Sequence, residues 1–307
     1  MAELKSRRAA LECMLWAGTG VVWTVAGGIP RGRLIGTAEA ATRDFSFVQI
    51  SDSHIGFSHD PNMDVPGTLK SGIDLLKAMP KRPSLMLHTG DVSHLSKPSE
   101  FDTAAQIIGT AGFETHYVPG EHDVLIDETA PFIERFQKGV KQGNAGGAYY
   151  SFDNSGVHFI GLNNVSNLKA GGLGQLGDAQ LAWLQDDVSG RSASQPIVVF
   201  AHIPLWTVYA PWGWGTDDSA RALALLSRFG SVTVLNGHIH QVLQKVEGKV
   251  AFHTARSTAF PQPAPGTAPS AGPMKVDPGQ LRSVLGVASI TVVPTDAHLA
   301  IIDTPLA

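Results

Sequence analysis

The sequence has almost no cysteine. Its single thiol is Cys13, close to the start of a chain of 307 residues, so no disulfide framework is possible and a core of buried apolar side chains must hold the fold. There is also no excess of basic residues, with 23 lysines and arginines against 27 aspartates and glutamates. Binding to the phosphate backbone of nucleic acid needs a basic face, so we expect a small substrate and no nucleic acid polymer as partner.

Long apolar runs are absent as well. The longest candidate extends from Cys13 to Ile29 and is interrupted by glycines, which makes it short and weak for a stable transmembrane span. Arg7 and Arg8 precede this run, and Ala38-Glu39-Ala40 offers small residues at the positions where signal peptides are cut. We interpret residues 1–40 as a twin-arginine-like export signal. A retained membrane anchor is the alternative.

An export signal has consequences for location and partners. We expect transport by the twin-arginine export machinery and a periplasmic or extracellular protein, with no stable membrane association after cleavage. The protein would remain membrane-anchored if the signal were not cleaved. No domain boundary is apparent after Ala40, so residues 41–307 are predicted to form a single domain.

Apolar runs alternate with amphipathic segments in this domain. Strands are predicted at 45–50, 84–89, 115–118, 149–153, 157–162, 197–201 and from 232. Helices are predicted at 66–79, 98–108, 177–188 and 219–229. The middle of the chain is predicted to be antiparallel, with hairpins at Asn154-Ser155-Gly156 and around Glu247-Gly248, and the strands 287–293 and 298–303 to form a terminal hairpin on the second sheet. Six prolines within 260–279 favour a surface excursion, with a lid over the site as the alternative.

Residues that can bind metal follow these apolar runs. One run ends at Asn236-Gly237 and is followed by His238 and His240. Extended backbone places alternate side chains on one side, so both imidazoles are expected to point to a common metal position. The same pattern of a polar turn after an apolar run occurs at Asp52 and His54, Asp91, Glu121 and His122, and His202. Ligands of open α/β sheets gather at the carboxyl ends of strands, so these side chains are expected to meet.

Together these residues form five ordered motifs. They are Asp52-Ser53-His54, Gly90-Asp91, Gly120-Glu121-His122-Asp123, His202 and Gly237-His238-Ile239-His240. The series resembles the calcineurin-like metallophosphoesterase superfamily, in particular the branch of purple acid phosphatases and cyclic nucleotide phosphodiesterases, over residues 45–255. The resemblance implies an α/β fold, a four-layer α/β/β/α sandwich of two mixed sheets, with a binuclear metal site at the strand carboxyl ends.

The resemblance also implies a role for each motif residue. Asp52, His54 and His240 would hold one metal ion, Glu121, His202 and His238 the other, and Asp91 would bridge them. Two such ions lower the pKa of a shared water, so that hydroxide attacks phosphorus in line. His122 would protonate or stabilise the leaving oxygen, and Asp123 would orient that imidazole.

Two positions depart from the family pattern. Glu121 stands where the family has asparagine and adds a negative charge. We therefore predict either a higher pH optimum or a trivalent ion in one position, with Mn or Fe favoured and Zn possible. His94 stands where purple acid phosphatases carry a tyrosine, so no tyrosinate colour is expected. We interpret His94 as a pocket residue, with metal ligation as the alternative.

Clues to the substrate are local. Trp206, Trp212 and Trp214 lie in a Pro- and Gly-broken segment after His202. They are predicted to form a wall against an apolar or planar leaving group, with packing in the core as the alternative. His253 and Arg256 are predicted to contact phosphate, although Arg256 also fits a surface position.

The sequence thus predicts an exported phosphoesterase that uses two metal ions to hydrolyse small phosphomonoesters or phosphodiesters. The two substrate classes are not separated by any motif. The alternative function is a metal-stabilised ligand-binding protein in which Glu121 weakens turnover.

Overall fold

A computed structural model describes residues 20–26, 29–35, 45–292 and 299–307. Strands β1 (Gly20–Ala26) and β2 (Ile29–Ile35) pair with each other in an antiparallel two-stranded sheet. The rest of the predicted export signal, residues 1–40, lies outside the described residues, so the structure does not test it. Among the helices of the described ranges, none combines the length and the apolar character needed to cross a membrane.

The first large sheet has five strands in the order β13-β12-β3-β4-β5. The strands are β3 (Ser46–Ile50), β4 (Leu85–His88), β5 (Glu114–Tyr117), β12 (Gly286–Thr291) and β13 (Ala300–Pro305). Strands β3, β4 and β5 are parallel, whereas β12 runs antiparallel to both β3 and β13. The terminal hairpin therefore forms as predicted but extends the first sheet, so its predicted place on the second sheet is wrong.

The second large sheet has six strands in the order β10-β11-β9-β8-β7-β6. They are β6 (Tyr150–Asn154), β7 (Val157–Gly161), β8 (Ile197–Phe200), β9 (Val232–Asn236), β10 (Gln244–Glu247) and β11 (Val250–Thr254). Both predicted hairpins are present, β6–β7 and β10–β11. The four central strands are parallel, however, so the antiparallel character predicted for the middle of the chain is confined to the two edges.

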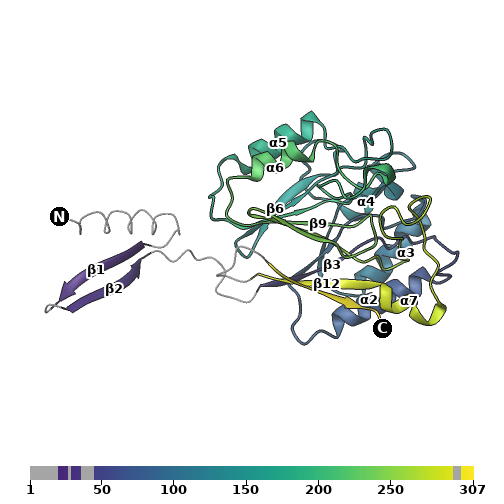
Figure 1. The fold of residues 1–307 in the computed structure, drawn as a ribbon, viewed down its shortest axis with the longest axis horizontal. Coiled ribbons are helices and arrows are strands. Elements are labelled where there is room, and N and C mark those ends of the chain that lie inside the picture. The colour runs from purple at the N-terminus through teal and green to yellow at the C-terminus, as the bar shows by residue number, and fades with distance from the viewer. Residues whose placement is uncertain (1–19, 27–28, 36–44, 293–298) are drawn as a thin grey trace.

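Helices cover the outer face of each sheet. On the first sheet lie α2 (Val65–Lys77), α3 (Pro98–Gly109), α4 (Ala130–Phe136) and α7 (Leu281–Val284); on the second lie α5 (Asp178–Ser189) and α6 (Ser219–Leu226). Figure 1 shows α5 and α6 at one side of the molecule and α2 and α7 at the opposite side, with the labelled strands of the two large sheets between them. Three short 3₁₀ turns are η1 (Glu121–Asp123), η2 (Ala210–Trp212) and η3 (Pro278–Gln280). The predicted four-layer α/β/β/α sandwich is confirmed.

Apolar side chains fill the space between each sheet and its helices. Another layer of apolar side chains lies between the two sheets and fixes how they stack. Phe47 from β3 meets Phe159 from β7 edge-on, with ring centroids 5.2 Å apart, and Phe152 stacks on Phe159 at 4.9 Å. Phe47 and Phe159 are fully buried, and Leu87 and Phe200 pack in the same cluster. Because aromatic side chains bury large apolar areas, this layer holds the carboxyl ends of the two sheets at a defined separation.

Candidate metal centre

The predicted ligands all lie directly after strands. From the first sheet, Asp52 and His54 follow β3, Asp91 follows β4, and Glu121 follows β5. From the second sheet, His202 follows β8, and His238 and His240 follow β9. A hydrogen bond joins the two halves, because the Asp52 Oδ1 atom accepts from the backbone N–H of His238 at 3.0 Å. The structure thus brings the ends of five strands to one place.

The side chains form two neighbouring groups, as the family pattern implied. In the first, Nε2 of His240 lies 3.2 Å from Oδ1 of Asp52 and 3.3 Å from Nε2 of His54. In the second, Glu121 Oε2 lies 3.0 Å from His202 Nε2, and Glu121 Oε1 lies 2.9 Å from His238 Nδ1. The ligand atoms within each group lie within 4.8 Å of one another. Each group is therefore small enough to surround one cation.

Asp91 connects the two groups. Its Oδ2 atom lies 3.5 Å from Nε2 of His54 and 3.3 Å from Nε2 of His202. Its other oxygen accepts a hydrogen bond from the backbone N–H of His122 at 2.9 Å. One carboxylate oxygen thus faces one imidazole from each group, which is the position of a bridging ligand.

The backbone at His238 and His240 is not extended. The prediction that extended backbone points both imidazoles to a common metal position is therefore wrong. Both residues have positive φ angles, 70° and 54°, and they point into different groups instead of to one metal position. Asp52, His54 and Asp91 also have positive φ angles of 40° to 52°. Such conformations cost on the order of 1–3 kcal/mol each for residues other than glycine and occur mainly at functional sites. Five of the seven predicted ligands therefore have a positive φ, although Ser96, Asp127, Glu128, Ala148 and Ser155 outside the motifs have one as well.

Two motif glycines allow the loops to approach each other. A Cβ atom on Gly120 would lie 2.0 Å from Oδ1 of Asp91, and one on Gly237 would lie 2.0 Å from Oγ of Ser51. Real Cβ atoms do not come this close to other heavy atoms, and the neighbours are buried. Any larger residue at either position would push a ligand loop away from the centre.

Backbone carbonyls fix the orientation of two ligand imidazoles. Nδ1 of His202 lies 2.7 Å from the carbonyl of Thr89, and Nδ1 of His240 lies 2.6 Å from the carbonyl of Phe260. An N–H at Nδ1 leaves Nε2 with a free lone pair directed at the centre, the usual arrangement of a metal-binding histidine. Sequence reasoning missed both contacts, because a carbonyl oxygen is present at every residue and gives no signal in the amino-acid pattern.

Opposite charges within the groups shift their ionisation. Although burial raises the pKa of Glu121 and of Asp52, the neighbouring imidazoles lower both, to about 2 for Asp52 beside His240. Burial lowers the pKa of His202, but the charges of Asp91 and Glu121 raise it well above 6.5. Burial and then the nearby imidazoles of His122 and His240 hold the pKa of His54 well below 6.5. The centre therefore favours ionised carboxylates and a positive charge among them.

The residues present fit two metal ions. Nε2 of His202 and Oε2 of Glu121 are buried and lie 3.0 Å apart, yet neither atom has a hydrogen-bond partner in the described structure. Leaving such polar atoms unsatisfied is costly, and a cation bound between them removes the cost. The donor set consists only of imidazole nitrogens and carboxylate oxygens, which suits Mn, Fe and Zn.

His122 lies at the edge of the centre in a position suited to proton transfer. Its Nδ1 atom lies 2.7 Å from the carbonyl of His94, which fixes an N–H there and leaves Nε2 for the substrate. Burial lowers the pKa of His122, but the charges of Asp91 and Glu121 raise it above 6.5 overall. A protonated imidazole beside the metal ligands is the geometry expected of a general acid.

Asp123 does not orient His122, and this prediction is wrong. Its buried carboxylate accepts from the backbone N–H groups of Val92, Ser93 and Gly120 at 2.8 to 3.0 Å. Burial and the charge of Asp91 raise the pKa of Asp123 to about 7, against the effect of these hydrogen bonds. Asp123 therefore ties the Asp91 loop to the His122 loop, and the His94 carbonyl takes the orienting role.

His94 lies beside the centre and contacts two of its imidazoles. Its ring stacks on that of His122, with centroids 4.9 Å apart and planes at 15°, and its Nδ1 atom lies 3.3 Å from Nδ1 of His54. Together with His54 and His122 it forms a third group of nitrogen atoms within 4.8 Å. His94 thus contacts Nδ1 of His54, whereas Nε2 of His54 faces Asp91.

The three tryptophans do not form one wall. Trp214 is fully buried, and its ring packs against Trp212 at 5.0 Å, while Trp206 packs on Phe252 at 5.0 Å. Trp214 thus cannot contact a substrate in this structure, and Trp206 belongs to the apolar layer under α5 and α6. The alternative of core packing holds for these two residues. Trp212 keeps partial exposure and meets Tyr209 edge-on.

His253 and Arg256 are engaged away from the ligands. Nε2 of the buried His253 lies 3.0 Å from Asp303 on β13, and Arg256 donates to the carbonyl of Ser283 on α7 at 2.6 Å. Both side chains thus join the second sheet to the last elements of the first sheet. Their contacts give no support to the predicted phosphate binding.

Two groups of histidines and carboxylates, joined by Asp91 at the strand ends of a double-sheet α/β sandwich, define a protein that can hold two metal ions. Residues 45–242 match the family model described as calcineurin-like phosphoesterase, which covers more than half of the chain. The chain belongs to this family and is a metallophosphoesterase.

Two curated relatives are named as phosphodiesterases, and two solved structures share the fold. A glycerophosphodiester phosphodiesterase, GpdQ of Enterobacter lignolyticus, is 25% identical over 223 residues, covering 70% of this chain and 77% of the relative. A 3',5'-cyclic-nucleotide phosphodiesterase of a Nostoc species is 26% identical over 221 residues, covering 70% and 79%. A dimetal phosphatase from Danio rerio shares the fold with a TM-score of 0.65 at 12% identity, covering 86% of this chain and 96% of the other. Purple acid phosphatase PPD1 of yellow lupin gives 0.61 at 13% identity, covering 87% and 52%.

Proposed function

We propose that this metallophosphoesterase is exported and hydrolyses small phosphodiesters. The observation that carries the proposal is the position of Asp91 between two groups of candidate ligands, with His122 beside it. The names of the two curated relatives, both phosphodiesterases, favour diesters over monoesters.

Each residue of the centre has a task in this reaction. Asp52, His54 and His240 would hold one cation and Glu121, His202 and His238 the other, with Asp91 between them. Cations bound there would stabilise the developing negative charge on phosphoryl oxygens and make a water molecule more acidic. His122 would hold a proton on Nε2 and give it to the leaving alkoxide, because its Nδ1 hydrogen is already committed to the His94 carbonyl.

Hydrolysis of nitrophenyl esters by purified protein with added Mn²⁺ tests the proposal. We expect faster turnover of bis-nitrophenyl phosphate than of nitrophenyl phosphate, and loss of both activities to background in Asp91→Ala. Asp74→Ala is the matched control, since Asp74 is an exposed aspartate on α2 that pairs with Lys70. Faster turnover of the monoester would overturn the preference for diesters, and an active Asp91→Ala variant would overturn the role of the centre.

Export is proposed from the sequence signals alone. The paired Arg7 and Arg8, the glycine-interrupted apolar run and the small residues at 38–40 support it. Sequencing the amino terminus of protein recovered from outside the cytoplasm should find a start near residue 41. Replacement of both arginines by lysine should retain the uncut protein in the cytoplasm, and export of that variant at normal levels would contradict a twin-arginine route.

A further inference from the structure

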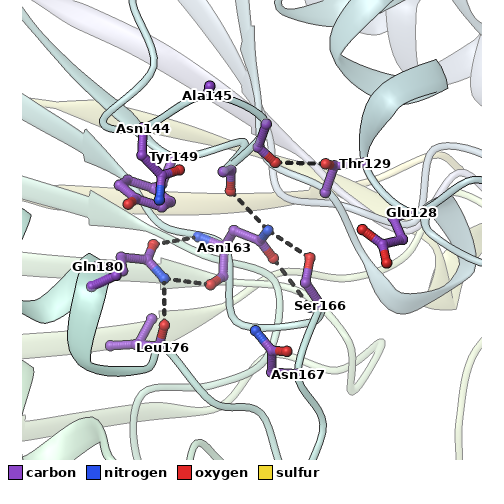
Figure 2. Close-up of a pocket in the computed structure, with 13 residues that line it drawn as sticks. Glu128, Thr129, Asn144, Ala145, Tyr149, Asn163, Ser166, Asn167, Leu176 and Gln180 are labelled. Carbon is purple, nitrogen blue, oxygen red and sulfur yellow. Dashed lines mark hydrogen bonds between the residues drawn. The ribbon is translucent and has the colours of Figure 1, made fainter.

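The loops that follow the two strands beside β8 and β9 have different surroundings. After β7, the backbone of Asn163 exchanges two hydrogen bonds with the side chain of Gln180, and both residues line a polar hollow (Figure 2). The residues that line this hollow lie within 128–129, 144–149, 163–167 and 176–180, and these ranges contain none of the candidate metal ligands. After β11, the chain instead contacts all three ligands of the first group, which are Asp52, His54 and His240. The loop after β11 is therefore the one that can affect metal binding.

The hydroxyl of Ser257 ties this loop to the loop that carries Asp52. The buried Ser257 donates to the backbone carbonyl of Asp52 at 2.7 Å. The same oxygen accepts from the backbone N–H groups of Ala259 and Phe260 at 2.8 and 3.1 Å. The buried side chain of Asn62 in turn donates to the carbonyl of Ala259 at 2.7 Å. Phe260 is therefore held at a fixed place beside the first group, because moving it would break buried hydrogen bonds.

Phe260 contacts two candidate ligands with its ring and one of them also with its backbone. It is the first residue of the Pro-rich segment 260–279, and it is buried. The centroid of its ring lies 4.8 Å from that of His54, with the planes at 28°, and 4.6 Å from that of His240, with the planes at 43°. Its carbonyl oxygen lies 2.6 Å from Nδ1 of His240. Phe260 therefore restricts both imidazoles of the first group and fixes the tautomer of one.

The second group is supported by other residues. Nδ1 of His202 lies 2.7 Å from the carbonyl of Thr89, and the carbonyl of His238 accepts from the side chain of Gln262 at 3.0 Å. The ring contacts of Phe260 are with Phe57, His54 and His240, and none of these residues belongs to the second group. Residues 257–260 also lie outside 45–242, the part of the chain that the family model matches. The family pattern therefore assigns them no role.

We propose that Phe260, held in place by Ser257, is a positioning residue of the first cation site and sets the metal affinity of that site alone. An imidazole that is already packed and hydrogen-bonded in its binding orientation loses little freedom when an ion binds. Loss of such outer partners typically weakens metal binding by about 10- to 100-fold. The inference rests on the two-cation centre of the proposed function, but it does not depend on which phosphoester is the substrate.

Titration calorimetry of the metal-free protein with Mn²⁺ tests the proposal in two backgrounds. His238→Ala leaves the first group complete, and His54→Ala leaves the second group complete. Phe260→Leu keeps the backbone carbonyl but removes the ring. We expect it to raise the Kd for Mn²⁺ about tenfold or more in His238→Ala, and to leave the Kd in His54→Ala unchanged. Phe132→Leu makes the same exchange at a fully buried position on α4 and should change neither Kd.

Each result supports or overturns the positioning role. Equal weakening of Mn²⁺ binding in both backgrounds would make Phe260 a general packing residue and overturn the proposal, as would an unchanged Kd in His238→Ala. If circular dichroism shows that Phe260→Leu does not fold, Ser257→Ala is compared in the same two backgrounds by the same criteria. A wild type that binds two Mn²⁺ ions but hydrolyses no diester would refute the proposed function and leave this inference standing. A wild type that binds no Mn²⁺ would overturn both.

Discussion

Glu121 gives the centre a third carboxylate where the family pattern has a neutral amide. Beside Asp52 and Asp91, it leaves two divalent cations with less positive charge to acidify a nearby water. We expect Glu121→Asn to move the pH optimum of hydrolysis to lower values if both ions are divalent. Metal analysis of the same samples shows whether the wild type instead holds a trivalent ion. Glu114→Gln, at an exposed position on β5, serves as control, and an unchanged pH profile in Glu121→Asn would refute the charge argument.

Replacement of His122 should affect the rate of hydrolysis differently from replacement of a metal ligand, because the effect should depend on the leaving group. If it protonates the leaving oxygen, His122→Gln should slow hydrolysis of an alkyl diester by about 10²- to 10⁴-fold. Nitrophenolate leaves without a proton, so bis-nitrophenyl phosphate should lose far less. The comparison of kcat for the two substrates is the measurement, with His116→Gln on β5 as control. Equal losses on both substrates would indicate that His122 serves the metal centre and not the leaving group.

At the scale of elements, α5 is joined to the second sheet by hydrogen bonds around the buried His158. Asp187 accepts from Ser151 Oγ at 2.6 Å and lies 2.7 Å from Nε2 of His158, whose other nitrogen lies 3.0 Å from Asp153. Burial raises the pKa of Asp187, but its hydrogen bonds to His158 and Ser151 lower it below 3.8 overall. A carboxyl group whose folded pKa is depressed stabilises the fold above its unfolded pKa, and this contribution is lost as the pH falls through the folded value.

Asp187→Asn should therefore lower the free energy of unfolding at pH 7 by about 1 kcal/mol. The difference from the wild type should shrink as the pH is lowered below 3.8, the ordinary aspartate value. Urea unfolding at neutral and acid pH measures both effects, and Asp186→Asn on the exposed side of the same helix is the control. A constant difference at all pH values would show that the carboxylate charge is not responsible.

Most strands, four of the helices and the set of candidate ligands could be predicted from the sequence, because they follow from short-range patterns, whereas the short helices α4 and α7 were not predicted. Strands such as Leu85–His88 are continuous apolar runs, and the ligands stand directly behind them. Contacts between residues far apart in the sequence could not be predicted. Nothing in Gly286–Thr291 indicates that it pairs with β3, and nothing near Asp218 in the sequence indicates that its carboxylate accepts from the N–H groups of Leu176 and Gly177. The partners of His253 and Asp123 were missed for the same reason.

At the scale of the whole molecule, metal binding should raise thermal stability. An ion that binds only the folded chain stabilises it by about 2.7 kcal/mol at one hundred times its Kd. For a domain of this size, that corresponds to a rise in Tm of roughly 5 to 10 °C. Scanning calorimetry with Mn²⁺ and with chelator measures the shift, which Asp91→Ala should reduce. An equal shift in that variant would place the stabilising ion elsewhere.

The hydrogen bond from His238 to Asp52 joins candidate ligands that come from different sheets. Asp52, His54, Asp91 and Glu121 come from one sheet, and His202, His238 and His240 come from the other. Neither half can assemble the centre alone, so catalytic turnover reports on correct docking of the two halves of the sandwich. Recovery of hydrolysis during refolding should lag behind the return of secondary structure and coincide with the last step of assembly.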